Sequence, residues 1–254
     1  MKEQNKVIMS LAMCLLFLLL SMVYTVYTVE AQETISSELP VWNGNVTAGA
    51  NWQTGNTDRF NFALGADAAR KTDRDRYSAN ILFSYSEEDG NKTAESYYGA
   101  GKYDYFFTQV MYGYVGIEML KDEFKDLSLR TVVGPGVGYQ VWNEEKKSLL
   151  VEGGIAYFSE NNIDAQDDDW ITGRLAGSLM YALLRQLTFT DQLIIYPSFK
   201  NVGEFQFRNE AALATPLASG WALKLSNILE YDSDPPDDID KTDWNWILAV
   251  QYSY

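Results

Sequence analysis

The chain has 254 residues, with 20 Lys and Arg against 35 Asp and Glu, which gives a formal net charge of −15. It contains no histidine and one cysteine, Cys14. These counts exclude Ser-His-Asp and Cys-His catalysis, zinc sites made of His or Cys, and intrachain disulfides. The acidic balance argues against a nucleic-acid partner, because binding phosphates needs a basic face.

Residues 1–31 are predicted to be a cleavable signal peptide. A compact apolar core runs over 11–20, and the segment 29–31 (Val-Glu-Ala) fits the small-x-Ala cleavage pattern. The alternative is an uncleaved anchor, because the apolar stretch over 7–28 is long enough to span a bilayer. Cleavage leaves 32–254 as a single exported domain.

Apolar and polar residues alternate with period two through almost all of the chain after residue 40, which is typical of β-strands. In the last stretch, Trp246 and Leu248 share one face, whereas Asn245 and Ile247 share the other. The pattern predicts about twelve strands, over 42–54, 57–70, 76–86, 93–105, 108–120, 126–141, 147–159, 169–183, 186–199, 203–216, 220–232 and 242–254.

Three features indicate that the apolar face meets lipid rather than a core. Full charges such as Arg130 and Glu152 recur in mid-strand on the polar face. The chain ends on an alternating strand with Tyr252 and Tyr254, which look like the C-terminal signal that outer-membrane assembly machinery reads. Amphipathic rings belong at bilayer interfaces, and the tryptophans near strand ends predict an aromatic girdle of Trp42, Trp52, Trp142, Trp170, Trp221, Trp244 and Trp246.

The expected fold is therefore all-β: a single antiparallel transmembrane β-barrel in the outer membrane of a Gram-negative bacterium. Its partners would be lipid, lipopolysaccharide and the barrel-assembly machinery. Short turns are expected on the periplasmic side, at 71–75, 106–107, 143–146, 184–185 and 217–219. Longer acidic loops are expected outside, at 87–92, 160–168 and 232–241, together with tight connections at 55–56 and near Asn201.

Several short motifs occur in a specific order along the chain. They are Gly55-Asn56-Thr57-Asp58, Arg130 before Gly134-Pro135-Gly136-Val137-Gly138-Tyr139, Tyr196-Pro197, Tyr231, Asp234-Pro235 and Lys241-Thr242-Asp243. Together they resemble the salt-induced outer-membrane protein family, the YdiY-like proteins, over nearly the whole expected mature chain. The resemblance implies an outer-membrane barrel, and it brings no catalytic residues.

Gly134, Gly136 and Gly138 look at first like a phosphate-binding loop. They lack the following helix and lysine that such a loop needs. All three fall on one strand face, so we expect a stripe without side chains that lets another group approach inside the barrel.

An acidic loop is a weak candidate for loosely bound calcium or magnesium, through Asp232, Asp234, Asp237, Asp238 and Asp240. It lacks the glycine and the terminal glutamate of an EF-hand. The simpler interpretation is a solvated, repulsive rim, and divalent bridging to lipopolysaccharide phosphates is the alternative. No other cofactor is expected.

The facing assignment places twelve charges in the lumen. Six are basic and six acidic: Arg59, Lys102, Arg130, Arg174, Arg208, Lys224, Asp67, Asp104, Glu118, Glu152, Glu210 and Glu230. A turn at 217–219 would put Arg208 opposite Ile228 and Glu210 opposite Ser226. Diagonal reach then predicts the ion pairs Arg208–Glu230 and Glu210–Lys224. Such pairing makes acid–base catalysis by lumen carboxylates a poor hypothesis.

Three polar residues, Asp191, Asn209 and Asn227, interrupt the predicted lipid face. A lipid-facing aspartate in mid-bilayer is costly. We expect a bulge that turns Asp191 inward, and the alternative is contact of this region with another protein. The leading function is a porin-like channel for ions or small solutes, and the competing one is a structural barrel with a plugged lumen.

Overall fold

The computed structural model describes, within the compact unit Pro40–Tyr254, the backbone of residues 42–53, 59–184, 187–201, 203–235 and 239–254. The expected signal peptide and the connection at 55–56 lie outside these ranges, as does most of the turn at 184–185. Within the ranges, no helix combines the length and the apolar character needed to cross a membrane.

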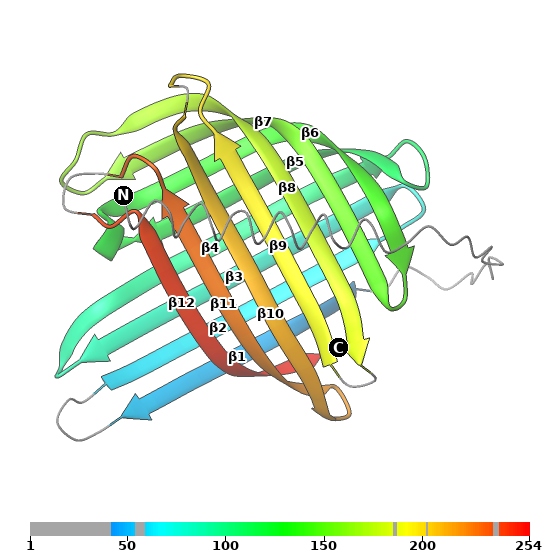
Figure 1. Ribbon diagram of the computed structural model, residues 1–254, viewed down its shortest axis with the longest axis horizontal. Coiled ribbons are helices and arrows are strands. Elements are labelled where there is room, and N and C mark those ends of the chain that lie inside the picture. Colours follow the sequence, from blue (N-terminus) through cyan, green and yellow to red (C-terminus); the bar gives the residue numbers. More distant parts are fainter. Residues whose placement is uncertain (1–41, 54–58, 185–186, 202, 236–238) are drawn as a thin grey trace. The chain divides into compact units, whose positions relative to one another are not determined.

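Twelve antiparallel strands in the described chain pair in sequence order and close into a barrel (Figure 1). They are β1 (Trp42–Gln53), β2 (Arg59–Lys71), β3 (Asp75–Glu88), β4 (Asn91–Phe106), β5 (Met111–Asp122), β6 (Leu127–Glu144), β7 (Lys147–Asn162), β8 (Asp168–Leu184), β9 (Leu187–Pro197), β10 (Phe205–Ala218), β11 (Trp221–Asp232) and β12 (Thr242–Ser253). The shortest has 11 residues, which is enough to cross a bilayer when tilted. The predicted all-β barrel is confirmed.

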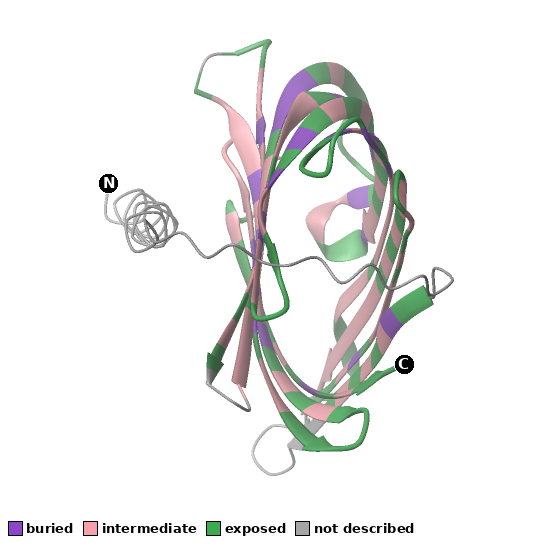
Figure 2. Cartoon of the chain, turned by 90° about the vertical axis from the view of Figure 1, so that its right-hand side faces the viewer, coloured by how far each residue is buried: buried purple, intermediate pink, exposed green. Residues whose placement is uncertain are grey.

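Side chains alternate between the two faces of the wall, as the sequence pattern predicts. Outward positions carry exposed apolar groups such as Ile81 and Leu248, each 60% exposed. Inward positions carry polar groups such as Asp104 and Arg174, which are buried. Figure 2 shows the alternation as bands of colour along the strands. An apolar exterior around a polar interior is the pattern of a barrel that meets lipid.

The strands are joined at two ends, which we call the turn end and the loop end. The turn end joins β2 to β3, β4 to β5, and so on, and both β1 and β12 reach it with their terminal sides. At this end β4 continues through Phe106, so the predicted turn at 106–107 is displaced to 107–110. Thr108 holds that turn by accepting a hydrogen bond from the Met111 N–H at 2.9 Å.

The loop end differs from the sequence expectation at two connections. The predicted acidic loop at 87–92 is a two-residue hairpin, in which Asp89 and Gly90 have φ of 50° and 77°. Asp-Gly tolerates two positive φ values, which is what a type I′ turn requires. The β5–β6 connection, to which the sequence analysis assigned nothing, forms the short 3₁₀ helix η1 (Glu123–Lys125), capped by Asp122.

The expected bulge at Asp191 is absent, and that prediction is wrong. β9 pairs through Asp191↔Leu179 and Asp191↔Ala211 without a register shift there. Its neighbour Gln192 lines the interior, so Asp191 points outward. It is satisfied locally instead, because the Asn209 amide on β10 donates a hydrogen bond to its carboxylate at 2.9 Å. The bulge was expected to keep the Asp191 carboxylate away from lipid. The Asn209 amide on the same outward face satisfies that carboxylate instead.

Candidate functional site: the barrel interior

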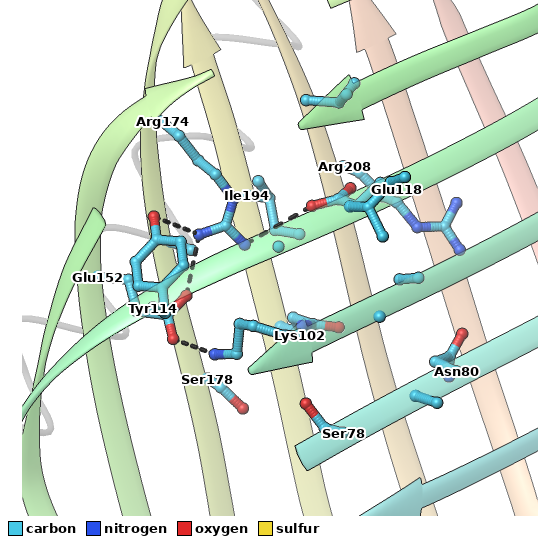
Figure 3. A pocket seen from close by; sticks show the side chains of 18 of the residues that line it. Ser78, Asn80, Lys102, Tyr114, Glu118, Glu152, Arg174, Ser178, Ile194 and Arg208 are labelled. Atoms are coloured by element: carbon cyan, nitrogen blue, oxygen red, sulfur yellow. Dashed lines mark hydrogen bonds and ion pairs between the residues drawn. The ribbon is translucent and has the colours of Figure 1, made fainter. Parts of the chain in front are cut away.

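A cluster of paired charges occupies the interior between β3 and β8. Arg174 on β8 lies at its centre (Figure 3), with one guanidinium nitrogen 2.9 Å from a Glu152 oxygen and the other 3.6 Å from Glu118. Lys102 on β4 forms a further ion pair with Glu152. On β3, Arg76 pairs with Asp104 at 2.5 Å. The cluster joins strands that are not neighbours in the wall, so it crosslinks the barrel through its interior.

Tyrosines complete this cluster and were not anticipated. The Tyr112 hydroxyl donates to Glu152 at 2.8 Å, and the Tyr196 hydroxyl donates to Glu118 at 2.7 Å. The Tyr114 hydroxyl accepts a bond from Arg174 at 3.0 Å. Charged hydrogen bonds of this kind are roughly twice as strong as neutral ones. Their signal in the sequence was parity, since Tyr112 and Tyr114 share a strand face with the predicted lumen charge Glu118, and Tyr196 shares its face with the polar Gln192.

The glycine stripe on β6 makes room for two of these rings, as the sequence predicted. A Cβ on Gly136 would lie 2.4 Å from the Tyr114 ring, and one on Gly138 would lie 2.2 Å from the Tyr112 ring. Only a residue without a side chain permits such contact. The stripe therefore serves packing inside the barrel, and it has no role as a phosphate loop.

One contact spans the full width of the bore. The guanidinium carbon of Arg208 on β10 lies 4.6 Å from the ring centre of Tyr98 on β4. Six strand-to-strand steps separate β4 from β10 in either direction round the barrel, so these strands are diametrically opposite. A cation over an aromatic face is attracted by the ring quadrupole. We call this contact the first crossbar.

A second crossbar starts from η1. Lys125 forms ion pairs with Glu230 on β11 and, at 3.1 Å, with Asp243 on β12. Both partners belong to the opposite wall, so η1 must fold over the lumen, and Figure 2 shows it inside the ring of strands. Lys125 was not predicted as a lumen charge, because the β5–β6 connection that carries it had been assigned no role.

Both ion pairs predicted for β10 and β11 are present, although the register between the two strands differs from the expected one. Arg208 pairs with Glu230, and Lys224 lies 3.7 Å from Glu210. Arg208 is directly opposite Glu230, and Glu210 is opposite Ile228. The turn contains only residues 219–220, and an irregularity between Pro216 and Ala218 moves the register by two residues from the one expected. Long side chains bridge the remaining offset.

The other predicted lumen charges have local partners. Asp67 accepts a hydrogen bond from Asn45 at 2.9 Å, and Arg130 pairs with Glu160 at 2.5 Å. The side chain of Arg59 is outside the described residues.

Three cavities that share lining residues lie beside the crossbars. One of about 600 Å³ lies at the loop end, one of about 40 Å³ at mid-height, and one of about 330 Å³ toward the turn end. Leu82 and Ile228 line both of the first two. Asp67 and Glu210 line both of the last two. The first two cavities thus border mainly β1–β3, β11 and β12, and the third lies mostly against β4–β10.

The acidic loop that was the weak candidate for a cation site already makes contacts within the protein. Asp232 accepts a hydrogen bond from the Gln206 amide at 2.7 Å and lies 3.8 Å from Arg130. Asp237 and Asp238 fall outside the described residues. Among the residues that are described, no three acidic, His or Cys side chains converge as a metal site would require.

The aromatic girdle needs one correction. Trp42, Trp221, Trp244 and Trp246 are exposed on the outside. Trp170, however, stacks on Phe158 at 4.9 Å in the interior. It shares its face of β8 with Arg174, so period two turns it inward, away from lipid. Trp142 lies beneath the Lys147 ammonium at the turn end, and the Trp52 side chain is outside the described residues.

The C-terminal residues close the barrel at the turn end. The N–H of Tyr254 donates to the Gly44 carbonyl at 3.1 Å, and the Gly44 N–H donates back at 3.3 Å. The ring of Tyr252 packs against Trp221 at 4.9 Å. These contacts give the two tyrosines a structural role in closure.

The closed antiparallel wall, apolar outside and charge-lined inside, defines a β-barrel of the membrane-spanning type. The amino-acid sequence also assigns the chain to a protein family. The chain belongs to the family described as "Protein of unknown function, DUF481", whose model matches residues 46–254. No curated protein matches the chain.

Solved structures share the fold at low identity. The NanC porin is 8% identical with a TM-score of 0.50, over 84% of this chain and 99% of that one. The KdgM porin is 11% identical with a TM-score of 0.44, over 84% and 99%. The outer membrane channel DcaP of Acinetobacter baumannii is 10% identical with a TM-score of 0.41, over 85% and 97%. The likeness to the NanC porin shows the fold alone.

Proposed function

We propose that the chain is an outer-membrane channel that passes ions and small solutes through the barrel interior. The observation that carries the proposal is the series of neighbouring cavities, which share lining residues, from the loop end toward the turn end. Its narrowest member, about 40 Å³, has room for a water molecule. The path therefore fits ions and very small solutes in the arrangement observed, and larger ones only after side chains move.

The charges along the path support weak selectivity. Lys224 is set against Glu210, and Arg208 against Glu230. Selectivity in such pores follows the unbalanced charge that a permeating ion meets. A balanced lining with an acidic rim favours cations slightly.

Purified protein in a planar lipid bilayer tests the proposal. Discrete conductance steps, absent from bilayers treated with detergent alone, are expected. Silent bilayers that contain heat-modifiable, correctly inserted protein would contradict channel function. Insertion is checked separately on gels, where an intact barrel runs faster unboiled than boiled.

The second candidate function is a non-transporting envelope barrel, and the two crossbars favour it. Tyr98 with Arg208, and Lys125 with Glu230, close the direct line through the bore. The same bilayer experiment separates the candidates. An enzyme is not proposed, because the interior carboxylates Glu118 and Glu152 are engaged by Arg174 and Lys102.

Location and partners complete the proposal. We place the loop end outside and the turn end in the periplasm, since such barrels keep short turns inside. Export by the signal peptide, recognition of Tyr252 and Tyr254 by assembly machinery, and contact with lipopolysaccharide belong to this proposal. Loose divalent bridging at the acidic loop and kinship with the salt-induced, YdiY-like branch belong to it as well.

A further inference from the structure

Three polar side chains lie together on the outward face of the barrel. They are Asp191 on β9, Asn209 on β10 and Asn227 on β11, and these strands are neighbours in one wall (Figure 1). Period two turns all three outward, because each has a sequence neighbour that lines an interior cavity: Gln192, Glu210 and Ser226. We call these three outward side chains the polar patch.

The strand register makes the polar patch compact. Asp191 and Asn227 both pair with Ala211, from its two sides, so the three residues lie in one row across the wall. Neighbouring strands are about 4.8 Å apart, so two such spacings separate Asp191 from Asn227. Asn209 lies two residues from Ala211 on the same face of β10. Ala211 carries only a methyl group, and small residues let another protein approach closely within a membrane.

Apolar side chains surround the polar patch. The row through Ala211 continues with Leu179 on β8 and Trp246 on β12. Asn209 itself is paired with Leu193 on one side and Leu229 on the other. Hydrocarbon offers no hydrogen bond, so polar groups at this depth are expected to face protein. A polar centre within an apolar ring is the arrangement of an interface, in which the ring excludes solvent from the centre.

The hydrogen bonds within the polar patch leave one acceptor and one donor over. The Asn209 amide donates to one Asp191 oxygen at 2.9 Å and to the Gln192 carbonyl at 3.1 Å. The second Asp191 oxygen accepts no hydrogen bond from the described residues. The Asn227 amide nitrogen likewise has no partner in the part of the chain that the structure describes. A free carboxylate oxygen and a free amide donor therefore lie on one face, on either side of Ala211.

A second copy of the chain would satisfy both groups at once. In a two-fold interface, a residue of each copy contacts its counterpart's partner, and the contact is made twice. A two-fold axis along the membrane normal, passing near Ala211, brings Asp191 of each copy opposite Asn227 of the other. Lipid chains supply neither the donor nor the acceptor. Both halves of the bond are present on this chain, so no other protein is needed to complete it.

We propose that the polar patch is the centre of a symmetric homodimer interface in the membrane, formed by reciprocal hydrogen bonds between Asp191 and Asn227. The apolar ring packs around these bonds and excludes lipid from them. The interface lies on the outside of the barrel, so it does not depend on whether the bore conducts. It rests only on the membrane location of the barrel.

Disulfide crosslinking at the centre of the patch tests the proposal. Ala211→Cys, in a Cys14→Ser background, is purified, reconstituted into lipid vesicles, oxidised and run on a non-reducing gel. The matched control is Ile81→Cys on β3, which is outward and 60% exposed on a different part of the wall. A band of twice the chain mass, lost with reductant, is expected from Ala211→Cys. Ile81→Cys reports chance encounters alone and should give little of it.

Substitutions within the patch show whether the hydrogen bonds hold the dimer. Asp191→Leu or Asn227→Leu removes one side of both bonds, so the dimer dissociation constant should rise about tenfold or more. It is measured from the concentration dependence of the molecular mass in detergent, by light scattering. Asp191→Asn keeps an acceptor oxygen and should dimerise nearly as the parent does. Both Leu variants make the lipid face more apolar, and heat modifiability on gels checks that they fold.

Three results would overturn the proposal. One is an Ala211→Cys crosslinking yield no higher than that of Ile81→Cys in correctly inserted protein. Another is dimerisation of Asp191→Leu and Asn227→Leu that equals that of the parent. The third is crosslinking of Ala211→Cys, in outer membranes, to a protein of different mass, which would show that the patch receives another partner.

Discussion

The interior has two walls built from the same period-two pattern, and they behave differently. The charged wall, β4–β11, fills its inward positions with Arg, Lys, Glu and Tyr side chains that meet across the bore. The neutral wall, over the loop-end half of β1–β3 and β12, presents small or uncharged groups: Asn61, Ala63, Leu82, Ser84, Asn245 and Ile247. The cavities at the loop end and at mid-height border mainly the second wall, whereas the cavity toward the turn end lies mostly against the first.

The difference shows what long charged side chains do inside a barrel. Each buried charge needs a partner, and a partner on a distant strand crosslinks the wall and fills the space between. Small neutral side chains leave space and bind nothing across it. The charged wall is therefore expected to supply rigidity, and the neutral wall to leave space at the loop end and at mid-height.

Deletion of Tyr254 should have the largest effect, because the neutral wall is closed by few contacts. The deletion removes both backbone hydrogen bonds to Gly44, which extend the four residue pairs that join β1 to β12. We expect most of the protein to fail to assemble, measured as the heat-modifiable fraction in outer membranes. Tyr254→Phe keeps the backbone and the ring and should assemble normally. Normal insertion of the deletion variant would contradict the role given to this residue.

Arg174→Met should most weaken the charged wall. It removes the cation that Glu152 and Glu118 share, which leaves Glu118 without its ion pair and Glu152 with Lys102 as its cation. Breaking a buried pair from one side costs about 3 kcal/mol, so the folded fraction should fall at lower urea concentration. Ser178→Ala, on the same face of β8, is the control. An equal change in both variants would mean that the cluster adds no stability.

Gly138→Ala should cost somewhat less. The new methyl would meet the Tyr112 ring at 2.2 Å, and overpacking of this kind costs about 2 kcal/mol. Gly99→Ala is the control, because a Cβ there meets no atom within 4 Å. Urea unfolding in detergent micelles should separate the two variants. If both are neutral, the tyrosines do not depend on the glycine stripe.

Lys224→Glu should change selectivity with little effect on folding. The substitution sets a like charge against Glu210 beside the narrow passage. The reversal potential in a salt gradient should move toward cation selectivity. Lys200→Glu, whose partner Asp168 is also exposed at the loop end, should move it much less. A reversal potential that does not move would remove Lys224 from the path.

Period two was enough to predict the strands, their facing and most of the lumen charges. It failed where one residue changes the register or a turn is tighter than its length suggests. The irregularity at Pro216 moved Arg208 opposite Glu230, and Asp89-Gly90 made a hairpin of an expected loop. Contacts between distant strands, such as Tyr98 with Arg208, depend on how a closed barrel is flattened, which alternation along one strand does not encode.

The conductance of Arg208→Ser tests the central claim most directly, that the first crossbar divides the bore and leaves a narrow path beside it. Removing the guanidinium frees Tyr98 and joins the spaces on its two sides. The account predicts single-channel steps clearly larger than those of the parent protein, with Ser178→Ala unchanged as the control. Equal steps from Arg208→Ser and the parent, in correctly inserted protein, would contradict it.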